Sequence, residues 1–275
     1  MLLNSGCSGQ IQNLESAIFN PMVLDFFDCN CQIGRAGAPV AGGPVTAQEI
    51  VDRLKPMGIS RALVYSVLSK ELHPVEGNAA VLEEVKDSPL VPCWSALPAE
   101  TGEMERPDEF IRKMRASGVR ALRLFPSAHS YNLTDWCMGT FYEALEADRV
   151  PIFVEMAQTS FEHIASALKA FPKLRIVVIR PAYRMDRMLY PLMERYEHLC
   201  VETSNYVVSG GIEKICRHFG SRRLIFGTGL PYYEPGAAVS PITYAEISDE
   251  DKQAIAGENL DDLLGWAGED RGKGA

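Results

Sequence analysis

Short runs of β-branched and aliphatic residues alternate with amphipathic segments along this chain. Such alternation is typical of a parallel sheet whose strands are joined by crossover helices. The run Ile176–Ile179 is apolar on both faces, as a strand buried within a parallel sheet requires. The pattern predicts eight strands: Val23–Cys31, Ala62–Val67, Leu90–Leu97, Val119–Phe125, Pro151–Met156, Leu174–Arg180, Leu199–Ser204 and Leu224–Gly227.

The segments between the predicted strands carry helix-end signals. Thr46 is followed three residues later by Glu49, which predicts a capping box at the start of a helix. Further helices are expected from Pro107 to Gly118, from Thr159 or Ser160 onward, and at Asn259–Trp266. Eight strand–helix units predict an α/β fold, a (β/α)8 TIM barrel whose chemistry lies at the C-terminal ends of the strands.

The length of 275 residues fits one such barrel, because these domains commonly take about 250 residues. We expect the barrel to span residues 22–267. Residues 1–21 are then an N-terminal arm, and residues 268–275 a flexible tail. The stretch 35–44, rich in Gly, Ala and Pro, is expected to form a loop over the top of the barrel.

Charge and cysteine content narrow the function classes. The chain has 27 Lys and Arg against 36 Asp and Glu, a net charge of −9, which disfavours binding to nucleic acids or anionic membranes. Seven scattered cysteines without a C-x-x-C pair indicate reduced thiols, and no secretory signal is evident, so we expect a cytoplasmic protein. A homodimer is the default expectation for such a barrel.

The first predicted strand ends in a polar pattern. Because side chains alternate along a strand, Asp28, Asn30 and Gln32 are expected to share the face that lines the barrel mouth. Cys29 and Cys31 are then expected on the opposite face, packed under the helices as small apolar groups.

Five segments resemble motifs of the amidohydrolase-related family (amidohydrolase 2 type), which are metal-dependent hydrolases built on TIM barrels. The segment at 28–34 resembles that family's D-x-H-x-H-x-G. The others are similar to P-x-x-x-H (Pro151–Glu155), to an F-P-x-L strand ending in His (Phe171–Arg180), to R-I-L-F-G-S-D-x-P (Arg223–Pro231) and to the closing G-N-A-x-R-L-L-G helix (Glu258–Gly265). The resemblance covers roughly residues 22 to 266 and implies a metallo-dependent-hydrolase-like barrel.

The family's metal ligands are substituted at every position that the resemblance carries over. Those positions hold Asn30, Gln32, Glu155, Arg180 and Gly229. Amides bind zinc and similar metals poorly, and a guanidinium has no lone pair to offer. We therefore expect no metal-binding residues and no cofactor here, although the family would bind a divalent metal such as zinc.

Two charged residues end neighbouring predicted strands at the place where the family binds its metal. We expect Glu155 and Arg180 to pair there, either to bind an anionic ligand or only to fill space. Arg123 shares their end of the barrel, as a second anion-binding group or as a structural partner of Glu155. His129 is the remaining candidate for general acid or base, unless it is a solvated loop residue.

The predicted catalytic residues are thus Glu155, Arg180 and His129. The predicted substrate-binding residues are Asn30, Gln32, Arg123, Tyr65, Trp94 and Glu202.

The family resemblance and the substituted metal-ligand positions together leave two candidate functions. In the first, the protein is a hydrolase of a small carboxylated lactone, ester or amide, working without the family's metal. An arginine would polarise the carbonyl, and Glu155 or His129 would serve as base. The resemblance also implies decarboxylation of a small carboxylated substrate as an alternative reaction. In the alternative, the protein is a catalytically inactive amidohydrolase-fold protein that binds a small anion or a protein partner.

Overall fold

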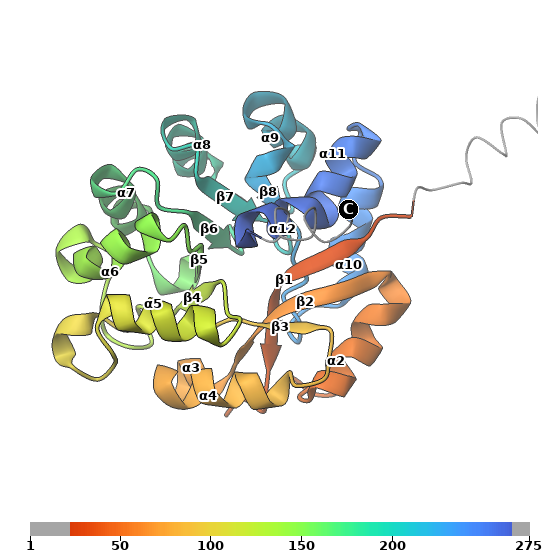
Figure 1. Ribbon diagram of the computed structural model, residues 1–275. Coiled ribbons are helices and arrows are strands. Elements are labelled where there is room, and N and C mark those ends of the chain that lie inside the picture. Colours follow the sequence, from red (N-terminus) through yellow and green to blue (C-terminus); the bar gives the residue numbers. More distant parts are fainter. Residues whose placement is uncertain (1–22, 266–275) are drawn as a thin grey trace, which may run out of the picture.

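The computed structural model describes residues 23–265, and the predicted N-terminal arm (1–21) and C-terminal tail (268–275) lie outside this range. Each of the eight predicted strands is present within it, ringed by helices (Figure 1). The strands are β1 (Phe26–Ile33), β2 (Ile59–Ser66), β3 (Leu90–Pro92), β4 (Leu122–Leu124), β5 (Ile152–Glu155), β6 (Ile176–Ile179), β7 (Leu199–Glu202) and β8 (Leu224–Ile225).

Helices follow the strands in the order that the sequence predicts. Thr46 and Glu49 form the expected capping box, and the side chain of Ser160 caps the helix that follows it. The helices are α2 (Ala47–Leu54), α3 (Leu68–Glu71), α4 (Pro74–Glu84), α5 (Pro107–Ala116), α6 (Asp135–Ala147), α7 (Phe161–Ala170), α8 (Asp186–Arg195), α9 (Gly211–Phe219), α10 (Pro235–Thr243), α11 (Asp249–Gln253) and α12 (Asn259–Leu264).

The strands are parallel and follow one another around a ring. Strands β1 to β3 form one hydrogen-bonded sheet and β4 to β8 another. Isolated bridges between Trp94 and Leu122 and between Cys31 and Leu230 join the two sheets at both seams. The Arg123 amide donates to the Trp94 carbonyl over 2.7 Å, and the Gln32 amide donates to the Leu230 carbonyl over 3.0 Å. This arrangement places the C-terminal ends of all eight strands at one mouth.

Two buried clusters form the core. The larger lies between strands and helices, and the smaller fills the barrel interior with side chains such as Phe27, Phe153 and Val177. Leu260 and Leu264 of α12 belong to the interior cluster, so this last helix closes the end of the barrel opposite the mouth. In Figure 1, α12 accordingly lies inside the ring of outer helices.

Strand β1 departs from simple alternation, which corrects one expectation. Cys29 joins the interior cluster, whereas Cys31 joins the cluster under the helices. The pairing of β1 with β2 shifts register between Asp28 and Cys31, so the two thiols do not share a face. Asp28 faces the segment that follows β8, where the backbone amide and the hydroxyl of Thr228 both donate hydrogen bonds to its carboxylate.

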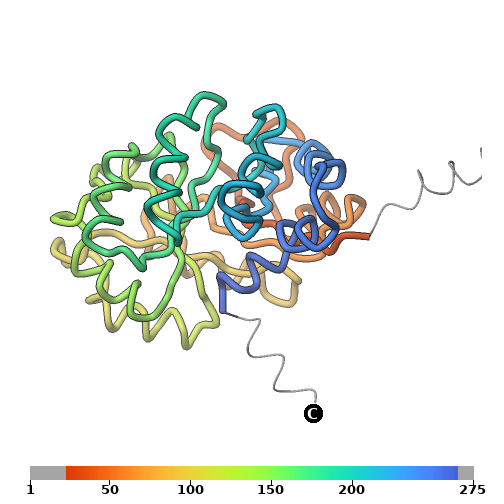
Figure 2. Tube along the Cα trace, turned by 90° about the horizontal axis from the view of Figure 1, so that it is seen from above, coloured from red at the N-terminus to blue at the C-terminus, as the bar shows by residue number. Residues whose placement is uncertain are grey.

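The two ends of the described chain meet in space. Figures 1 and 2 show the C-terminal helices beside strand β1, and the amide of Asp25, just before β1, donates to Gln253 Oε1 of α11 over 3.2 Å. Within residues 23–265, every helix is too short or too polar to cross a membrane.

Candidate functional site at the barrel mouth

Glu155 and Arg180 form an ion pair at the mouth. Glu155 ends β5 and Arg180 follows β6, and Arg180 Nη1 donates to Glu155 Oε1 over 2.8 Å. Both side chains are mostly buried, with 16% and 17% of their area exposed. The pair predicted from the two strand ends therefore forms.

The backbone of Arg180 adopts a conformation that is rare for a residue with a side chain. Its φ of +52° lies in the left-handed region. The Arg180 amide donates to Glu202 Oε2 over 3.0 Å, which holds the backbone in this turn. Glu202 thus positions Arg180 rather than contacting the Glu155 carboxylate.

Glu202 is fully buried at the end of β7. Besides the Arg180 amide, its carboxylate accepts hydrogen bonds from the amide and the hydroxyl of Ser204, at 2.7 and 3.0 Å. Burial nevertheless raises the pKa of Glu202 above its ordinary value. Gly227 makes room for this carboxylate, since a Cβ at that position would stand 2.3 Å from Glu202 Oε1.

Two tyrosines from the loop after β8 cover Arg180. Its guanidinium carbon lies 4.8 Å from the ring centre of Tyr232 and 4.9 Å from that of Tyr233. Both rings remain about two-fifths exposed, at 42% and 39%. Cation–π contacts of this kind cap the ion pair from the solvent side. Sequence reasoning assigned these tyrosines no role, because only the fold of the loop brings them onto Arg180.

Arg123 lies deeper in the barrel and completes the charged group. Its Nη1 donates to Asn30 Oδ1 over 3.1 Å, and its Nη2 lies 3.7 Å from Glu155 Oε2. The guanidinium carbon lies 5.3 Å from the ring centre of Tyr65. Arg123 is only 3% exposed, so two buried arginines face one glutamate.

A hydrogen-bonded polar group borders the arginines. The Tyr65 hydroxyl donates to Gln32 Oε1 over 3.0 Å, and the Tyr232 hydroxyl lies 3.4 Å from the same oxygen. Burial raises the pKa of Tyr65 to about 12, so its hydroxyl keeps its proton and remains a donor. Strand β1 thus supplies Asn30 and Gln32 to the mouth, but not Asp28.

The ionisation of Glu155 reflects opposing influences. Burial is the largest and raises the pKa of Glu155. The charges of Arg180 and Arg123, with the hydrogen bond from Arg180, together outweigh burial and leave the pKa below its ordinary value. Glu155 is therefore an anion at neutral pH, held by two cations.

Two predicted residues lie apart from this group. Trp94 packs against Phe110 of α5, with ring centres 5.6 Å apart, in the cluster between strands and helices. His129 lies in the loop after β4, edge-on to Phe125, and burial lowers its pKa. The charges that act on His129 are those of His73 and Glu103, not those of the Glu155 pair.

Three N–H donors in this group have no acceptor within the described chain. They are Arg123 Nε, Arg180 Nε and Asn30 Nδ2, and all three are buried. A buried donor without an acceptor costs roughly 1–3 kcal/mol. The group therefore offers hydrogen bonds that a further acceptor, such as a ligand oxygen, would satisfy.

The mouth is narrow in this conformation. A recess of about 10 Å³ lies between Gln32, Tyr232 and the loop that contains Val40 and Pro44. This loop is the Gly, Ala and Pro-rich stretch expected over the top of the barrel. Cavities of about 360 and 540 Å³ lie at the opposite end of the barrel. Because Tyr232 and Tyr233 cover Arg180, a ligand that reaches this guanidinium from the solvent side must displace them.

A sequence model of the amidohydrolase family matches residues 74–266. This range includes β3 to β8 and the Arg123, Glu155 and Arg180 group, whereas Asn30 and Gln32 precede it. No match to a curated protein sequence was found.

Solved structures share the fold at low sequence identity. An uncharacterised TIM-barrel protein from Bordetella bronchiseptica is 16% identical, with a TM-score of 0.68 over 89% of this chain and 100% of its own. A 5-carboxyvanillate decarboxylase from Novosphingobium aromaticivorans, complexed with manganese and 4-hydroxy-3-methoxy-5-nitrobenzoic acid, is 12% identical, with a TM-score of 0.71 over 90% and 97%. A dihydroxybenzoic acid decarboxylase from Polaromonas sp. JS666, with manganese and 2-nitroresorcinol, is 14% identical, with a TM-score of 0.67 over 89% and 98%.

The manganese in these structures corrects the expectation of no cofactor, because barrels of this fold do bind a metal. Within residues 23–265, no three His, Cys, Asp or Glu side chains come close enough together to hold a metal ion. Glu155 Oε1 is already bound to Arg180.

Proposed function

Because the chain belongs to the amidohydrolase family, we propose that it is a hydrolase whose barrel mouth binds a small carboxylated molecule. The substrate class is a lactone, ester or amide that carries a separate carboxylate. The observation that supports this is the set of three buried, unpartnered N–H donors on Arg123, Arg180 and Asn30. Two guanidiniums lie beside the single carboxylate of Glu155, and their unused N–H groups would suit a carboxylate on the ligand.

The ligand carboxylate would take the guanidinium of Arg180, and the charge of Arg123, on the other side of Glu155, would add to its attraction. A planar guanidinium binds a carboxylate through two parallel hydrogen bonds, and Arg180 now gives only Nη1 to Glu155. Tyr232 and Tyr233 lie on the solvent side and would move to admit the ligand. A ligand ring could then take their place beside the guanidinium.

This exchange would also prepare Glu155 for proton transfer. The charge of Arg180 is the main influence that lowers the pKa of Glu155. Once a ligand carboxylate shares Arg180, burial would raise that pKa and make Glu155 a better general base for water. Arg123, 3.7 Å from Glu155 Oε2, would stabilise the negative charge that forms on the carbonyl oxygen.

Carboxylate binding without turnover is the second candidate. It is favoured by the closed mouth, where Arg180 is bound to Glu155 and covered by two tyrosines. In that case the same donors hold the ligand, but Glu155 serves only as the counter-ion of the arginines.

Calorimetric titration with benzoate and 2,6-dihydroxybenzoate tests the shared binding step. Wild-type protein should bind at least one of them, and Arg123→Gln should weaken binding at least tenfold. Arg112→Gln, which removes an exposed positive charge on α5, is the matched control and should bind as wild type does. Equal affinity in the wild type, Arg123→Gln and Arg112→Gln would remove the assigned site.

A turnover screen separates the two candidates. Carboxylated lactones, esters and amides are incubated with chelator-treated protein and with manganese-loaded protein, and release of the acid product is followed. Carbon dioxide release from hydroxybenzoates is followed in parallel, because two of the structurally similar proteins are decarboxylases. Hydrolysis that is lost in Glu155→Gln supports the hydrolase, and binding without any turnover supports the second candidate.

A further inference from the structure

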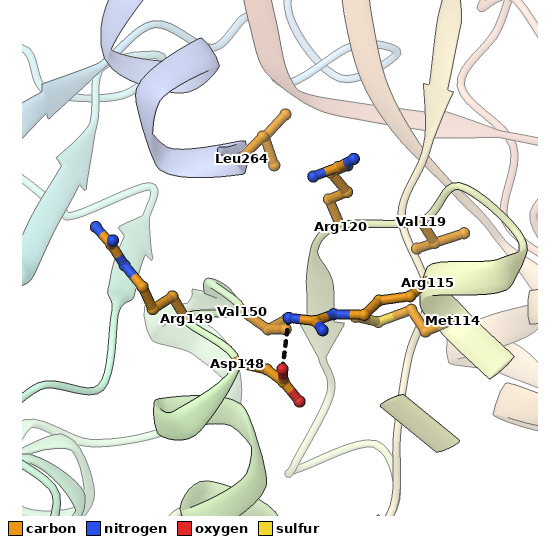
Figure 3. Close-up of a pocket in the computed structure, with 8 residues that line it drawn as sticks. All are labelled: Met114, Arg115, Val119, Arg120, Asp148, Arg149, Val150 and Leu264. Atoms are coloured by element: carbon orange, nitrogen blue, oxygen red, sulfur yellow. Dashed lines mark ion pairs between the residues drawn. The ribbon is translucent and has the colours of Figure 1, made fainter. Parts of the chain in front are cut away.

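A trough crosses the end of the barrel opposite the mouth. Two cavities of about 360 and 540 Å³ share Arg120, Asp148, Arg149 and Leu264, so they form one continuous depression. Figure 3 shows the first of them, with Arg120 and Arg149 on either side of a space that Leu264 of α12 borders. The combined volume is in the range of small-molecule sites.

The walls of the trough come from the residues that lead into the strands. Arg120 precedes β4, Arg149 precedes β5, and Arg175 stands directly before β6. Arg222 lies just before β8. Because parallel strands all begin at one end of a barrel, these arginines share a cavity although they are far apart in the sequence.

Positive charge is in excess in this trough. Even without Arg120, its lining within the described residues contains four arginines, Arg115, Arg149, Arg175 and Arg222, against two carboxylates, Asp148 and Asp262. Asp148 already forms an ion pair with Arg115 at the rim (Figure 3). The chain as a whole carries a net charge of −9, so this local excess runs against the overall composition.

The arginines influence one another. Burial lowers the pKa of Arg175, and the charge of Arg149 lowers it further. Arg175 Nη1 is held by the Leu263 carbonyl at 3.0 Å, so one wall of the trough is fixed to α12. An anion bound between these groups would relieve their repulsion, and two negative charges would match the excess better than one.

We propose that this trough is a second binding site, for a small compound with two linked phosphate groups. Guanidinium groups bind phosphate oxygens through paired hydrogen bonds, and here they approach from several sides of one cavity. The side chains of Leu264, Val119 and Val150 supply an apolar wall for the remainder of the compound. This site is separate from the mouth and does not depend on the function proposed for the mouth.

Calorimetric titration of the full chain with pyrophosphate tests the site. Wild-type protein should bind pyrophosphate, and the double variant Arg149→Gln/Arg222→Gln should bind at least tenfold more weakly. Both arginines are exposed, so the fold should persist, and circular dichroism checks this. Arg149→Lys/Arg222→Lys keeps the charge and should retain part of the affinity.

The matched control is Arg112→Gln/Arg217→Gln, which removes the same charge from exposed positions on α5 and α9 outside the trough. It should bind pyrophosphate as the wild type does. Absence of wild-type binding at millimolar pyrophosphate would overturn the proposal, and so would an equal loss in the two glutamine variants.

Two further results decide what occupies the trough. Crystals soaked in pyrophosphate should show the anion among Arg149, Arg175 and Arg222, whereas density at the mouth would overturn the proposal.

The acidic residues Glu269 and Asp270 follow shortly after Gly265, which lines the trough. Unchanged affinity in Glu269→Gln/Asp270→Asn supports a separate phosphate compound, and a tenfold gain would overturn it in favour of the chain's own carboxylates.

Discussion

Arg180 supplies the charge that keeps the Glu155 carboxylate ionised, and its removal tests that relation at the scale of one residue. In Arg180→Gln, burial continues to raise the pKa of Glu155, but its largest opposing charge is gone. We therefore expect the pKa of Glu155 to rise, as measured by carbon NMR of its carboxyl group. Arg184→Gln, an exposed arginine four residues away, is the control and should leave that pKa unchanged. The same pKa in all three proteins would contradict the account.

The sign of the stability effect follows from this lowered pKa. A carboxyl whose folded-state pKa is lowered stabilises the fold above its unfolded value of about 4.3. That stabilisation is lost as the pH falls through the lower, folded-state pKa. Acid unfolding of wild-type protein should therefore include a contribution from Glu155 that is absent in Arg180→Gln.

Gly227 tests how closely Glu202 is packed. A Cβ at this position would lie 2.3 Å from Glu202 Oε1 and 2.8 Å from Glu202 Cγ, so Gly227→Ala must displace a fully buried side chain. We expect a loss of about 1–3 kcal/mol in the free energy of unfolding, measured by urea denaturation. Gly139→Ala in α6 is the control, because its nearest neighbour stands 4.0 Å away. That change should leave stability equal or higher, as alanine favours a helix by up to about 1 kcal/mol.

The sequence could predict the Glu155–Arg180 pair because both residues end neighbouring strands, where geometry leaves little freedom. It could not predict the contacts of Arg180 with Tyr232 and Tyr233, which depend on the path of the loop after β8. For Trp94, by contrast, the sequence predicted a contact with the substrate that the structure does not place at the mouth. Its place on a predicted strand suggested the mouth, but its side chain packs toward α5.

At the scale of the element, helix α12 closes the end of the barrel opposite the mouth through its apolar side chains. Leu260 is 1% exposed within the interior cluster, whereas Leu263 is only partly buried against it. Leu260→Ala should cost about 2–5 kcal/mol of unfolding free energy, as buried leucine truncations do. Leu263→Ala in the same helix should cost clearly less in the same urea titration. Equal costs would mean that α12 does not seal the barrel through Leu260.

Strand order and helix positions were predictable because apolar runs and caps are local signals. The register shift in β1 was not, because no residue between Asp28 and Cys31 signals it, and it decides that Cys31 does not share the inward face of Cys29. The ends of short strands were also overestimated. The predicted Val119–Phe125 shortens to Leu122–Leu124, since hydrogen bonding rather than hydrophobicity sets strand limits.

At the scale of the whole molecule, the two ends of the barrel differ in what the sequence revealed. Residues at the C-terminal ends of the strands drew attention because chemistry gathers there in such barrels. The trough was not predicted, because Arg149, Arg175 and Arg222 are scattered through an acidic chain and only the closed ring of strands assembles them.

Ligand binding at the mouth should stabilise the entire fold. A compound that binds only the folded state at one hundred times its Kd adds about 2.7 kcal/mol to the free energy of unfolding. We expect this gain for wild-type protein with 2,6-dihydroxybenzoate, measured by urea denaturation, and little gain for Arg123→Gln at the same concentration. A similar gain in both proteins would place the ligand elsewhere.

The most direct test is a crystal structure of the protein with bound 2,6-dihydroxybenzoate. We predict that the ligand carboxylate lies within hydrogen-bond distance of the Arg180 guanidinium and on the Arg123 side of Glu155, with Tyr232 and Tyr233 moved from their present contacts. A ligand bound away from both arginines, or a metal ion held where Arg180 now meets Glu155, would contradict the account.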